Sequence, residues 1–469
     1  MARKKKEPKF YPSLEITNAG SEGKCIARVN GKVILVERAV PGDIADVKTT
    51  YQKHKYEEGH IETLVQASAD RTETFCEHVQ VCGGCKWQQM SYPAQLKYKQ
   101  QQVVDAFQRI GKFDFPEPDP IIGSEKIHFY RNKLEFSFTH KKWLTQVQDK
   151  ESMADHEHPG LGFHIPGRFD KVFDVQKCWL MDDLNNAIRN EIRAYAISNE
   201  LSFFDLYNQN GFLRTFTIRN NSKNQWMLIV SFGYDDAQLR NGLLMHLAEK
   251  FSNISALLYV INDKRNDTIF DLPIHVFKGD DFLIESLEGI QFKIGPKSFF
   301  QTNTQQTLNL YGKAREFANL TGNEIVYDLY TGVGTIALFM AQSAQKIIGI
   351  EYVPQAIEDA KVNAELNQIT HAHFYAGDMK DCLSDELIQL HGKPDVVITD
   401  PPRAGMHADV CKKLLELKAP KIVYISCNPA TQARDIALLN EMYKVTKVQA
   451  VDMFPHTHHV ESIALLELR

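Results

Sequence analysis

The sequence lacks any run of about 20 consecutive apolar residues, which is the length an α-helix needs to cross a bilayer. The basic residues near its start, Arg3–Lys6, are not followed by an apolar stretch, so the pattern of a secretory signal is missing too. These absences argue against a membrane partner. We expect a soluble, cytoplasmic protein that acts as a monomer.

The sequence also has no excess of positively charged residues. The chain has 54 Lys and Arg against 59 Asp and Glu, which gives a formal net charge of −5. Nucleic-acid-binding proteins contact phosphates with Lys and Arg, so this balance argues weakly against such a partner. A local basic face is compatible with an acidic chain, and Arg3–Lys6 with Lys9 is one candidate, although a solvated tail has the same composition.

The sequence has few cysteines, but three of them lie close together in the chain. The chain has eight, and three of them, Cys76, Cys82 and Cys85, fall within the stretch FCEHVQVCGGCKWQQ. Because the cytoplasm keeps thiols reduced, disulfide bonds are not expected. Clustered thiols in such a protein are more often metal ligands or catalytic groups.

The pattern of hydrophobic residues divides the chain into three predicted domains. Residues 1–68 contain short alternating strands with the turns NAGSEG, VNGK and VPGD, which predict a β-barrel of the OB type, a common nucleic-acid platform. A purely structural β-domain would show the same pattern. Residues 69–290 have mixed α+β character, with a helix over PAQLKYKQQQVVDAFQRIG and an exposed hairpin or loop at TQVQDKESMADHEHPG.

Residues 291–469 change in character, because short apolar strands alternate with helices. This alternation predicts a parallel sheet with right-handed crossovers. The final segment, TKVQAVDMFPHTHHVESIALLELR, contains two strands with no helix between them and predicts an antiparallel edge. The predicted fold class is therefore α/β, a doubly wound Rossmann-like domain of the methyltransferase type, with an N-terminal OB-like β-barrel and a mixed central domain.

A glycine-containing loop marks a candidate cofactor site. In YDLYTGVGT, Gly332 and Gly334 join a strand to a helix and allow close approach of a ligand, and Glu351 ends the next strand. A dinucleotide-binding loop has a similar pattern. Asp328 at the strand tip and Asp378 after the third strand favour S-adenosylmethionine over a nicotinamide cofactor, although Glu351 and Asp378 are each also compatible with capping roles.

Candidate catalytic residues follow the later strands. Asp400 in ITDPPRAGM and Cys427 in YISCNPAT both come just after strands, so we expect them at one rim of the sheet, and Glu461 opens the last strand. Methylation of uracil C5 needs a nucleophilic cysteine to activate the ring and a general base to remove the C5 proton. Cys427 and Glu461 fit these roles, whereas an isolated cysteine at a strand end is often just a buried small residue. DPP also occurs in amine methyltransferases, but those usually place an aromatic residue where this chain has Arg403.

Six motifs, in order, resemble those of the RNA uracil-C5 methyltransferases that make 5-methyluridine: GPKSFFQTN, LYTGVGT, GIEYVPQAIEDAKVNAELN, TDPPRAGM, YISCNPAT and FPHTHHVES. The resemblance implies Cys427 as nucleophile and Glu461 as base, and it implies an RNA-binding TRAM domain at the barrel. It also implies an S-adenosylmethionine site formed by Gln301, Tyr330, Glu351, Asp378 and Asp400, with Asp400 near the reacting centre. Thr335 departs from members that have asparagine there.

The same resemblance implies a role for the clustered cysteines as metal ligands. Cys76, Cys82 and Cys85, with Cys178 in DVQKCWL, are similar to the four ligands of a [4Fe–4S] cluster in some members. The spacing alone leaves zinc open, because four thiolates suit either metal centre. Zinc sites of four cysteines more often use two close pairs, and here one pair is joined by two single cysteines. The implied role is structural, or to shape an RNA-binding surface.

Members with both a barrel and a cluster act mostly on 23S ribosomal RNA, so the resemblance implies that substrate, with a single-stranded or flipped uridine in a loop. Tyr130 and Arg131 in FYRNK are candidates for contact with that loop, and a plain strand edge is the alternative. Three other functions stay open. The protein could be a transfer RNA uridine methyltransferase, an amine-directed methyltransferase, or a catalytically silent RNA-binding iron–sulfur protein.

Overall fold

The computed structural model describes residues 7–144 and 158–469, so the run Arg3–Lys6 and most of the segment TQVQDKESMADHEHPG lie outside the described residues. The chain forms two compact units. The first contains Met1–Val79, Gly84–Ile127 and Pro401–Arg469, and the second contains Gln80–Gly83 and His128–Asp400. Within the described ranges, no helix combines the length and the apolar character that a membrane span requires.

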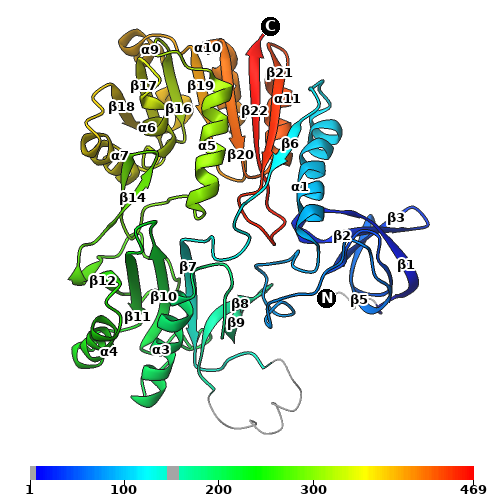
Figure 1. Ribbon diagram of the computed structural model, residues 1–469, viewed down its shortest axis with the longest axis vertical. Helices are drawn as coiled ribbons and strands as arrows, with labels where there is room; N and C mark the ends of the chain where they lie inside the picture. Colours follow the sequence, from blue (N-terminus) through cyan, green and yellow to red (C-terminus); the bar gives the residue numbers. More distant parts are fainter. Residues whose placement is uncertain (1–6, 145–157) are drawn as a thin grey trace, which may run out of the picture. The chain divides into compact units, whose positions relative to one another are not determined.

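The N-terminal strands of the first unit close into a barrel, as the sequence predicts (Figure 1). The strands are β1 (Phe10–Ala19), β2 (Cys25–Val29), β3 (Lys32–Glu37), β4 (Ile44–Gln52) and β5 (Tyr56–Gln66), in the order β1-β2-β3-β5-β4. All neighbours pair antiparallel except β3 and β5, which are parallel. Alternate side chains such as Ile34 and Val36 fill the interior, because successive residues of a strand face opposite sides.

The predicted helix after the cysteine-rich stretch is confirmed as α1 (Tyr92–Ala106), with Pro93 in its first turn. A π-helical turn at Phe107–Gly111 follows, and it ends at the left-handed Lys112. The buried face differs from the apolar stripe in the sequence, because Ile110 is 50% exposed whereas Gln95 and Lys99 are fully buried. The helix therefore buries polar side chains that need partners, and these partners are described below.

The C-terminal part of the first unit contains α10 (Ala408–Leu417), β20 (Lys421–Ser426), α11 (Pro429–Leu439), β21 (Tyr443–Val451) and β22 (Glu461–Leu468). Strand β22 lies between β20 and β21 and is antiparallel to both, which confirms the predicted antiparallel hairpin. Strand β6 (Asp119–Ile122) adds to β21 in parallel. The sequence gives no sign of this last pairing, since four residues are too few to show a periodicity.

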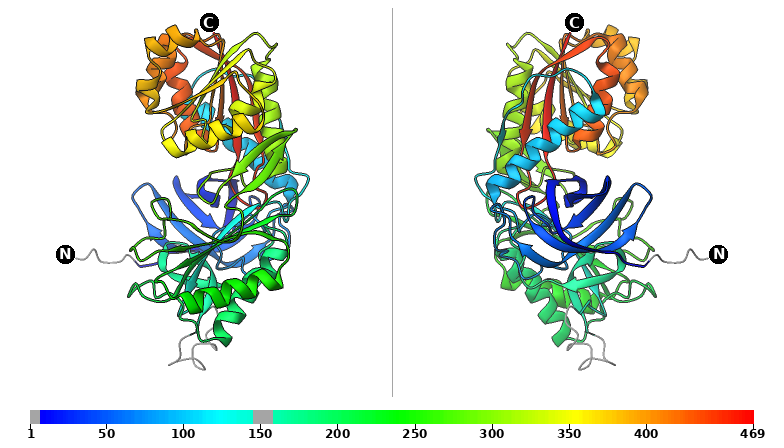
Figure 2. Two further views of the ribbon diagram at one scale, coloured as in Figure 1. Left: turned by 90° about the vertical axis from the view of Figure 1, so that its left-hand side faces the viewer. Right: turned by 90° about the vertical axis from the view of Figure 1, so that its right-hand side faces the viewer.

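The second unit contains a seven-stranded mixed sheet with the order β13-β12-β11-β10-β7-β8-β9. The strands are β7 (Lys133–Thr139), β8 (Gly160–Ile165), β9 (Arg168–Asp174), β10 (Leu213–Asn220), β11 (Trp226–Phe232), β12 (Ile254–Ile261) and β13 (His275–Gly279). Helices α3 (Leu184–Ser198) and α4 (Ala237–Lys250) pack against each other and against this sheet (Figure 2). Every residue of β11 is buried, as expected for a central strand covered on both faces.

The remainder of the second unit confirms the predicted strand–helix alternation. The hairpin β14 (Leu283–Leu287) and β15 (Ile290–Ile294) comes first, followed by α5 (Thr304–Ala318). Four parallel strands then have the order β18-β17-β16-β19. Their bounds, with the helices that follow them, are β16 (Ile325–Leu329), α6 (Thr335–Ala341), β17 (Lys346–Glu351), α7 (Pro354–Leu366), β18 (Ala372–Ala376), α8 (Met379–Cys382), α9 (Asp385–His391) and β19 (Val396–Thr399).

Candidate active site

Four predicted cofactor residues lie at the carboxyl ends of the four parallel strands of the second unit. Tyr330 directly follows β16, Glu351 is the last residue of β17, Asp378 comes two residues after β18, and Asp400 directly follows β19. Ligands of doubly wound sheets bind at this edge, so the topology gathers these side chains where a cofactor is expected.

The loop between β16 and α6 is shaped for close approach of a ligand. Gly332 and Gly334 both have positive φ values, of 56° and 81°. A Cβ on Gly332 would meet no atom within 4 Å, whereas one on Gly334 would lie 3.1 Å from the Ala360 side chain. Glu351 supports the loop, since its Oε2 accepts a hydrogen bond of 3.2 Å from the Gly332 amide.

Asp328 is a buried carboxylate beneath this loop. Its Oδ2 accepts hydrogen bonds from the Thr331 hydroxyl at 2.5 Å and from the Ala337 amide at 3.0 Å. Its Oδ1 is buried and has no hydrogen-bond partner. Burial raises the pKa of Asp328 to about 7, and the neighbouring charges of Asp400 and Glu351 act in the same direction.

Asp400 is the second carboxylate of this rim. The residue keeps some exposed surface, but burial of its carboxyl raises the pKa of Asp400 to about 7. Two carboxyls held in a desolvated place favour a cationic ligand, because a positive charge offsets the cost of ionising them. S-Adenosylmethionine carries a sulfonium and an ammonium group, so these residues fit it.

Gln301 and Asp378 have more local roles in the structure. The backbone carbonyl of Gln301 accepts a hydrogen bond of 3.0 Å from the Asn132 side chain. Asp378 caps α8, because its Oδ1 accepts from the Lys380 amide at 3.2 Å, and its Oδ2 lies 3.5 Å from the Lys380 ammonium. The capping alternative therefore holds for Asp378, and capping leaves its position at the rim unchanged.

The two predicted catalytic residues belong to the first unit, on adjacent antiparallel strands. Cys427 directly follows β20, and Glu461 is the first residue of β22 and is 5% exposed. The ladder runs without irregularity from Lys421 opposite Glu467 to Ser426 opposite Ser462. Cys427 comes directly after Ser426 and Glu461 directly before Ser462, so both follow the last pair of this ladder at the same end of the two strands.

The backbone around Cys427 is tied to the DPPRAG segment. Asn428 caps α11, since its Oδ1 accepts from the Ala430 amide at 3.2 Å, and its Nδ2 donates to the Arg403 carbonyl at 3.0 Å. The Thr431 hydroxyl donates to the same carbonyl at 3.2 Å. The side chain of Arg403 lies beside His459, with Nη2 3.4 Å from Nε2.

Helix α1 supports the segment that leads into Glu461. The fully buried Lys99 ammonium lies 2.5 Å from Asp452 Oδ1 and donates to the Phe454 carbonyl at 3.0 Å. Gln95 Oε1 accepts from the His456 amide at 2.7 Å. Burial lowers the pKa of Lys99, and the adjacent Asp452 opposes that effect.

The cysteine-rich stretch contacts the same segment. The Trp87 amide donates to the His456 carbonyl at 2.9 Å, and the Trp87 indole donates to the Gly23 carbonyl at 3.2 Å. Within the first unit this stretch therefore links the barrel to the residues before Glu461. The sequence carried one sign of the supporting contacts, because Lys99 lies at helical spacing from Leu96 and Val103 on the apolar side of α1.

The four cysteines of the expected cluster are divided between the two units. Cys76 and Cys85 belong to the first unit, and Cys82 and Cys178 belong to the second. Among the residues whose placement is described, no group of three or more His, Cys, Asp or Glu side chains could hold a metal ion. Burial raises the pKa of the Cys76 thiol. No catalytic step is assigned to a [4Fe–4S] cluster.

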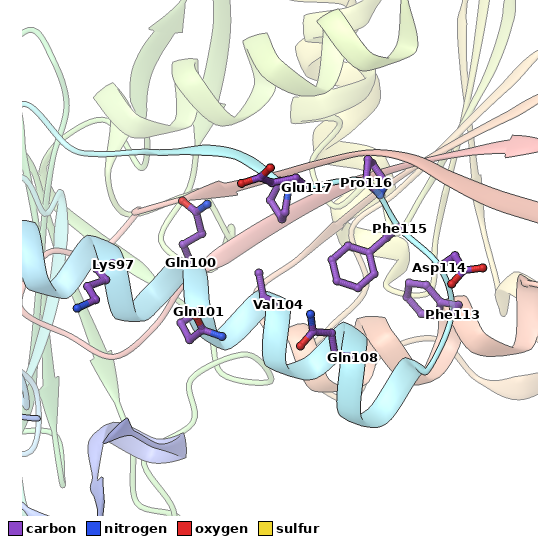
Figure 3. A pocket seen from close by; sticks show the side chains of 11 residues that line it. Lys97, Gln100, Gln101, Val104, Gln108, Phe113, Asp114, Phe115, Pro116 and Glu117 are labelled. Carbon is purple, nitrogen blue, oxygen red and sulfur yellow. The ribbon is translucent and has the colours of Figure 1, made fainter. Parts of the chain in front are cut away.

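A cavity of about 760 Å³ opens between α1 and the segment that follows it (Figure 3). Its lining includes Gln100, Gln108 and Phe115 (Figure 3), together with two acids, Asp114 and Glu117, against the single cation Lys97. None of the predicted site residues lines it. The acids do not favour a phosphate ligand, so we do not place the RNA-binding site there.

Comparisons with known proteins agree with this arrangement. Residues 279–469 match the family described as tRNA (Uracil-5-)-methyltransferase, and residues 13–61 match the TRAM domain. A protein of Bacteroides thetaiotaomicron named as an RNA methyltransferase is 55% identical over 452 residues, which are 96% of this chain and 100% of that protein. One from Porphyromonas gingivalis is 50% identical over 460 residues, 97% of this chain and 99% of that protein.

A solved structure extends the likeness to the whole fold. The Pyrococcus abyssi tRNA (uracil-54, C5)-methyltransferase, in complex with S-adenosyl-L-homocysteine, is similar with a TM-score of 0.74 and 26% identity. The match covers 97% of this chain and 100% of that one, and it confirms the predicted Rossmann-like fold class. With the matches to its barrel and to its C-terminal part, the chain belongs to the family of RNA (uracil-5-)-methyltransferases that carry a TRAM domain.

Proposed function

We propose that the protein transfers a methyl group from S-adenosylmethionine to C5 of a uridine in RNA, giving 5-methyluridine through a covalent cysteine–C6 intermediate. The observation that carries this proposal is the β20–β22 ladder, which ends at Ser426 opposite Ser462, with Cys427 directly after Ser426 and Glu461 directly before Ser462. A nucleophile and a general base at the same end of one ladder can both reach a single pyrimidine ring.

The proposed steps follow from the chemistry of uracil. The Cys427 thiolate adds to C6, and the C5–C6 π electrons move onto the ring as an enolate. C5 then attacks the sulfonium methyl carbon, whose bond to sulfur breaks, so that S-adenosylhomocysteine leaves. Glu461 removes the proton from C5, the double bond re-forms and the thiolate is expelled.

The second unit would bind the methyl donor. Asp328 and Asp400 would face its cationic groups, and Glu351, at the end of β17, would accept hydrogen bonds from the ribose hydroxyls. Gln301, Tyr330 and Asp378 complete the proposed set. The S-adenosyl-L-homocysteine bound to the similar Pyrococcus abyssi enzyme supports this choice of donor.

We propose 23S ribosomal RNA as the substrate, with the reacting uridine unstacked from its neighbours. Transfer RNA is the second candidate, and a specific observation favours it. The Pyrococcus abyssi protein is named for a transfer RNA position, and its match covers 97% of this chain. Overall domain organisation therefore does not separate the two substrates.

A methylation assay tests the reaction and the substrate together. Labelled S-adenosylmethionine is incubated with the protein and either unmodified 23S ribosomal RNA or unmodified transfer RNA, and 5-methyluridine is measured after digestion. We expect label in 5-methyluridine of ribosomal RNA. Label in transfer RNA alone would support the proposed reaction and refute ribosomal RNA as the substrate. Label in neither RNA would refute both the reaction and the substrate.

The covalent step has its own test. RNA containing 5-fluorouracil cannot lose the group at C5, so it should trap the enzyme as a stable adduct. The adduct should be absent in Cys427→Ala and retained in Cys382→Ala, which removes a partly exposed thiol that no proposed step uses. An adduct that survives in Cys427→Ala would refute the assignment of the nucleophile.

We also propose a [4Fe–4S] cluster on Cys76, Cys82, Cys85 and Cys178. Only the spacing of these cysteines and its resemblance to cluster-bearing members support it. Anaerobically purified protein should be brown, with a broad visible absorbance and about four iron atoms per chain. Colourless protein with stoichiometric zinc would replace the cluster by zinc, and metal-free protein of full activity would leave the cysteines without a metal role.

A further inference from the structure

An aromatic cluster on the second unit is not used by any step above. It consists of His128, Phe129 and Trp179, which we call the aromatic platform. The Phe129 and Trp179 rings have centroids 5.6 Å apart, and the His128 and Trp179 rings have centroids 6.1 Å apart. The Phe129 side chain is 37% exposed, so one ring of the cluster reaches the surface.

The backbone holds Phe129 in this exposed position. Its φ is +53°, a left-handed conformation that bulky residues rarely adopt. Hydrogen bonds fix the segment, because the Phe129 amide donates to the Trp179 carbonyl at 2.8 Å and the Arg131 amide donates to the Leu180 carbonyl at 2.7 Å. Backbone strain of this kind is found preferentially at functional sites.

A cation accompanies the rings. The Lys177 ammonium lies 4.1 Å from the centre of the Trp179 ring and 6.0 Å from that of Phe129. Its side chain is 38% exposed and its ammonium forms an ion pair of 3.6 Å with Asp183. Exposed rings beside a cation suit an unpaired nucleotide, whose base stacks on the ring and whose phosphate meets the charge.

The platform is physically continuous with the proposed cofactor segment. Asn132, three residues after Phe129, donates through its backbone amide to the Thr302 carbonyl at 2.8 Å. The Asn132 side chain donates to the Gln301 carbonyl and to the Thr304 hydroxyl, both at 3.0 Å. The segment before β7, which carries Phe129, is thus tied to the segment that carries Gln301.

We propose that the aromatic platform stacks an unpaired base of the RNA substrate, and that Lys177 binds the adjoining phosphate. The occupant is single-stranded RNA, so this inference rests on the proposed function. The neighbouring Arg131, which stays a candidate for RNA contact, supports the platform through its backbone, and the proposed stacking surface is Phe129 with Trp179.

Phe129→Gly is the informative variant, because glycine suits the left-handed backbone and removes the ring. With unmodified 23S ribosomal RNA, the Kd and the KM for RNA should each rise about tenfold, since one stacked base accounts for a loss of that order. The affinity for S-adenosylmethionine and kcat should not change. Tyr207→Ala, which removes an 82% exposed ring elsewhere in the same unit, is the matched control and should bind RNA normally.

Trp179 supplies a direct readout. RNA should quench the tryptophan emission of the wild type, and Trp179→Phe should remove that quenching while filter binding shows a nearly normal affinity. Unchanged RNA affinity in Phe129→Gly, or a loss of kcat with unchanged KM, would overturn the platform. If the wild type binds RNA through these residues but forms no 5-methyluridine, the proposed reaction is refuted, whereas the proposed role of the platform in RNA binding is supported.

Discussion

The two buried carboxyls of the second unit predict that binding of S-adenosylmethionine depends on pH. Burial raises the pKa values of Asp328 and Asp400 to about 7 in the ligand-free protein, from an ordinary value of 3.8. A cationic ligand favours the ionised carboxylate, so binding should release protons below pH 7. For one carboxyl the affinity should increase about tenfold for each pH unit up to 7 and then level off.

Titration calorimetry measures this effect directly. Binding is followed between pH 5.5 and 7.0, where the α-amino group of the ligand, with an ordinary pKa of about 7.7–8.0, stays mostly protonated. Near pH 6, where a carboxyl of pKa 7 is about nine-tenths protonated, repeating the titration in two buffers of different ionisation enthalpy should reveal the released proton.

Variants of the two carboxyls test which of them causes the pH dependence of S-adenosylmethionine binding. Asp328→Asn keeps an oxygen to accept from Thr331 and Ala337, so the loop should fold while its share of the pH dependence is lost. Asp400→Asn should remove the remaining share. Asp381→Asn, an exposed change in α8, is the control and should retain the wild-type profile. A pH-independent affinity in the wild type would refute the role of both carboxyls.

Three further predictions concern stability and turnover. The contribution of Asp328 and Asp400 to the stability of the ligand-free protein should fall as pH rises from 4 to 7, because the native carboxyls retain protons that the unfolded chain releases; urea unfolding at several pH values, with Asp328→Asn and Asp400→Asn compared against the wild type, isolates this contribution from that of His458, whose lowered pKa acts in the opposite direction. Lys99→Met should lower the free energy of unfolding by about 3–5 kcal/mol, since it leaves Asp452 buried without its ion pair, whereas exchange of an exposed lysine such as Lys412 should change it by less than about 0.5 kcal/mol. Glu461→Gln should accumulate a covalent adduct with ordinary RNA, visible by denaturing electrophoresis, because the C5 proton is no longer removed and the thiol cannot leave; rapid turnover in that variant would assign the base elsewhere.

The sequence predicts most of the strand–helix alternation because each element is long enough to show its own period. It also predicts that Glu351, Asp378 and Asp400 follow successive parallel strands, whose carboxyl ends lie at one edge, whereas Tyr330 comes only from the family resemblance. The buried role of Lys99 is harder to predict, because it depends on Asp452, which is 353 residues distant. The pairing of β6 with β21 is equally hard to predict, because nothing in the sequence of either strand identifies the other as its partner.

Two features of the first unit determine the position of Glu461: the register between β20 and β22, and the contacts that hold the segment before β22. Side-chain direction alternates along a strand, so a slip of one residue between β20 and β22 would turn Glu461 to the other face of the sheet. The buried apolar residues from Ile463 to Leu466 resist such a slip, because it would exchange the side chains that pack on the two covered faces of β22. The Lys99 and Gln95 contacts hold the preceding segment, so their loss should loosen that segment without moving the strand itself. Lys99→Met should consequently reduce stability strongly while leaving adduct formation on 5-fluorouracil RNA intact at low temperature, and loss of the adduct in folded Lys99→Met protein would show that the segment, rather than the register, positions the base.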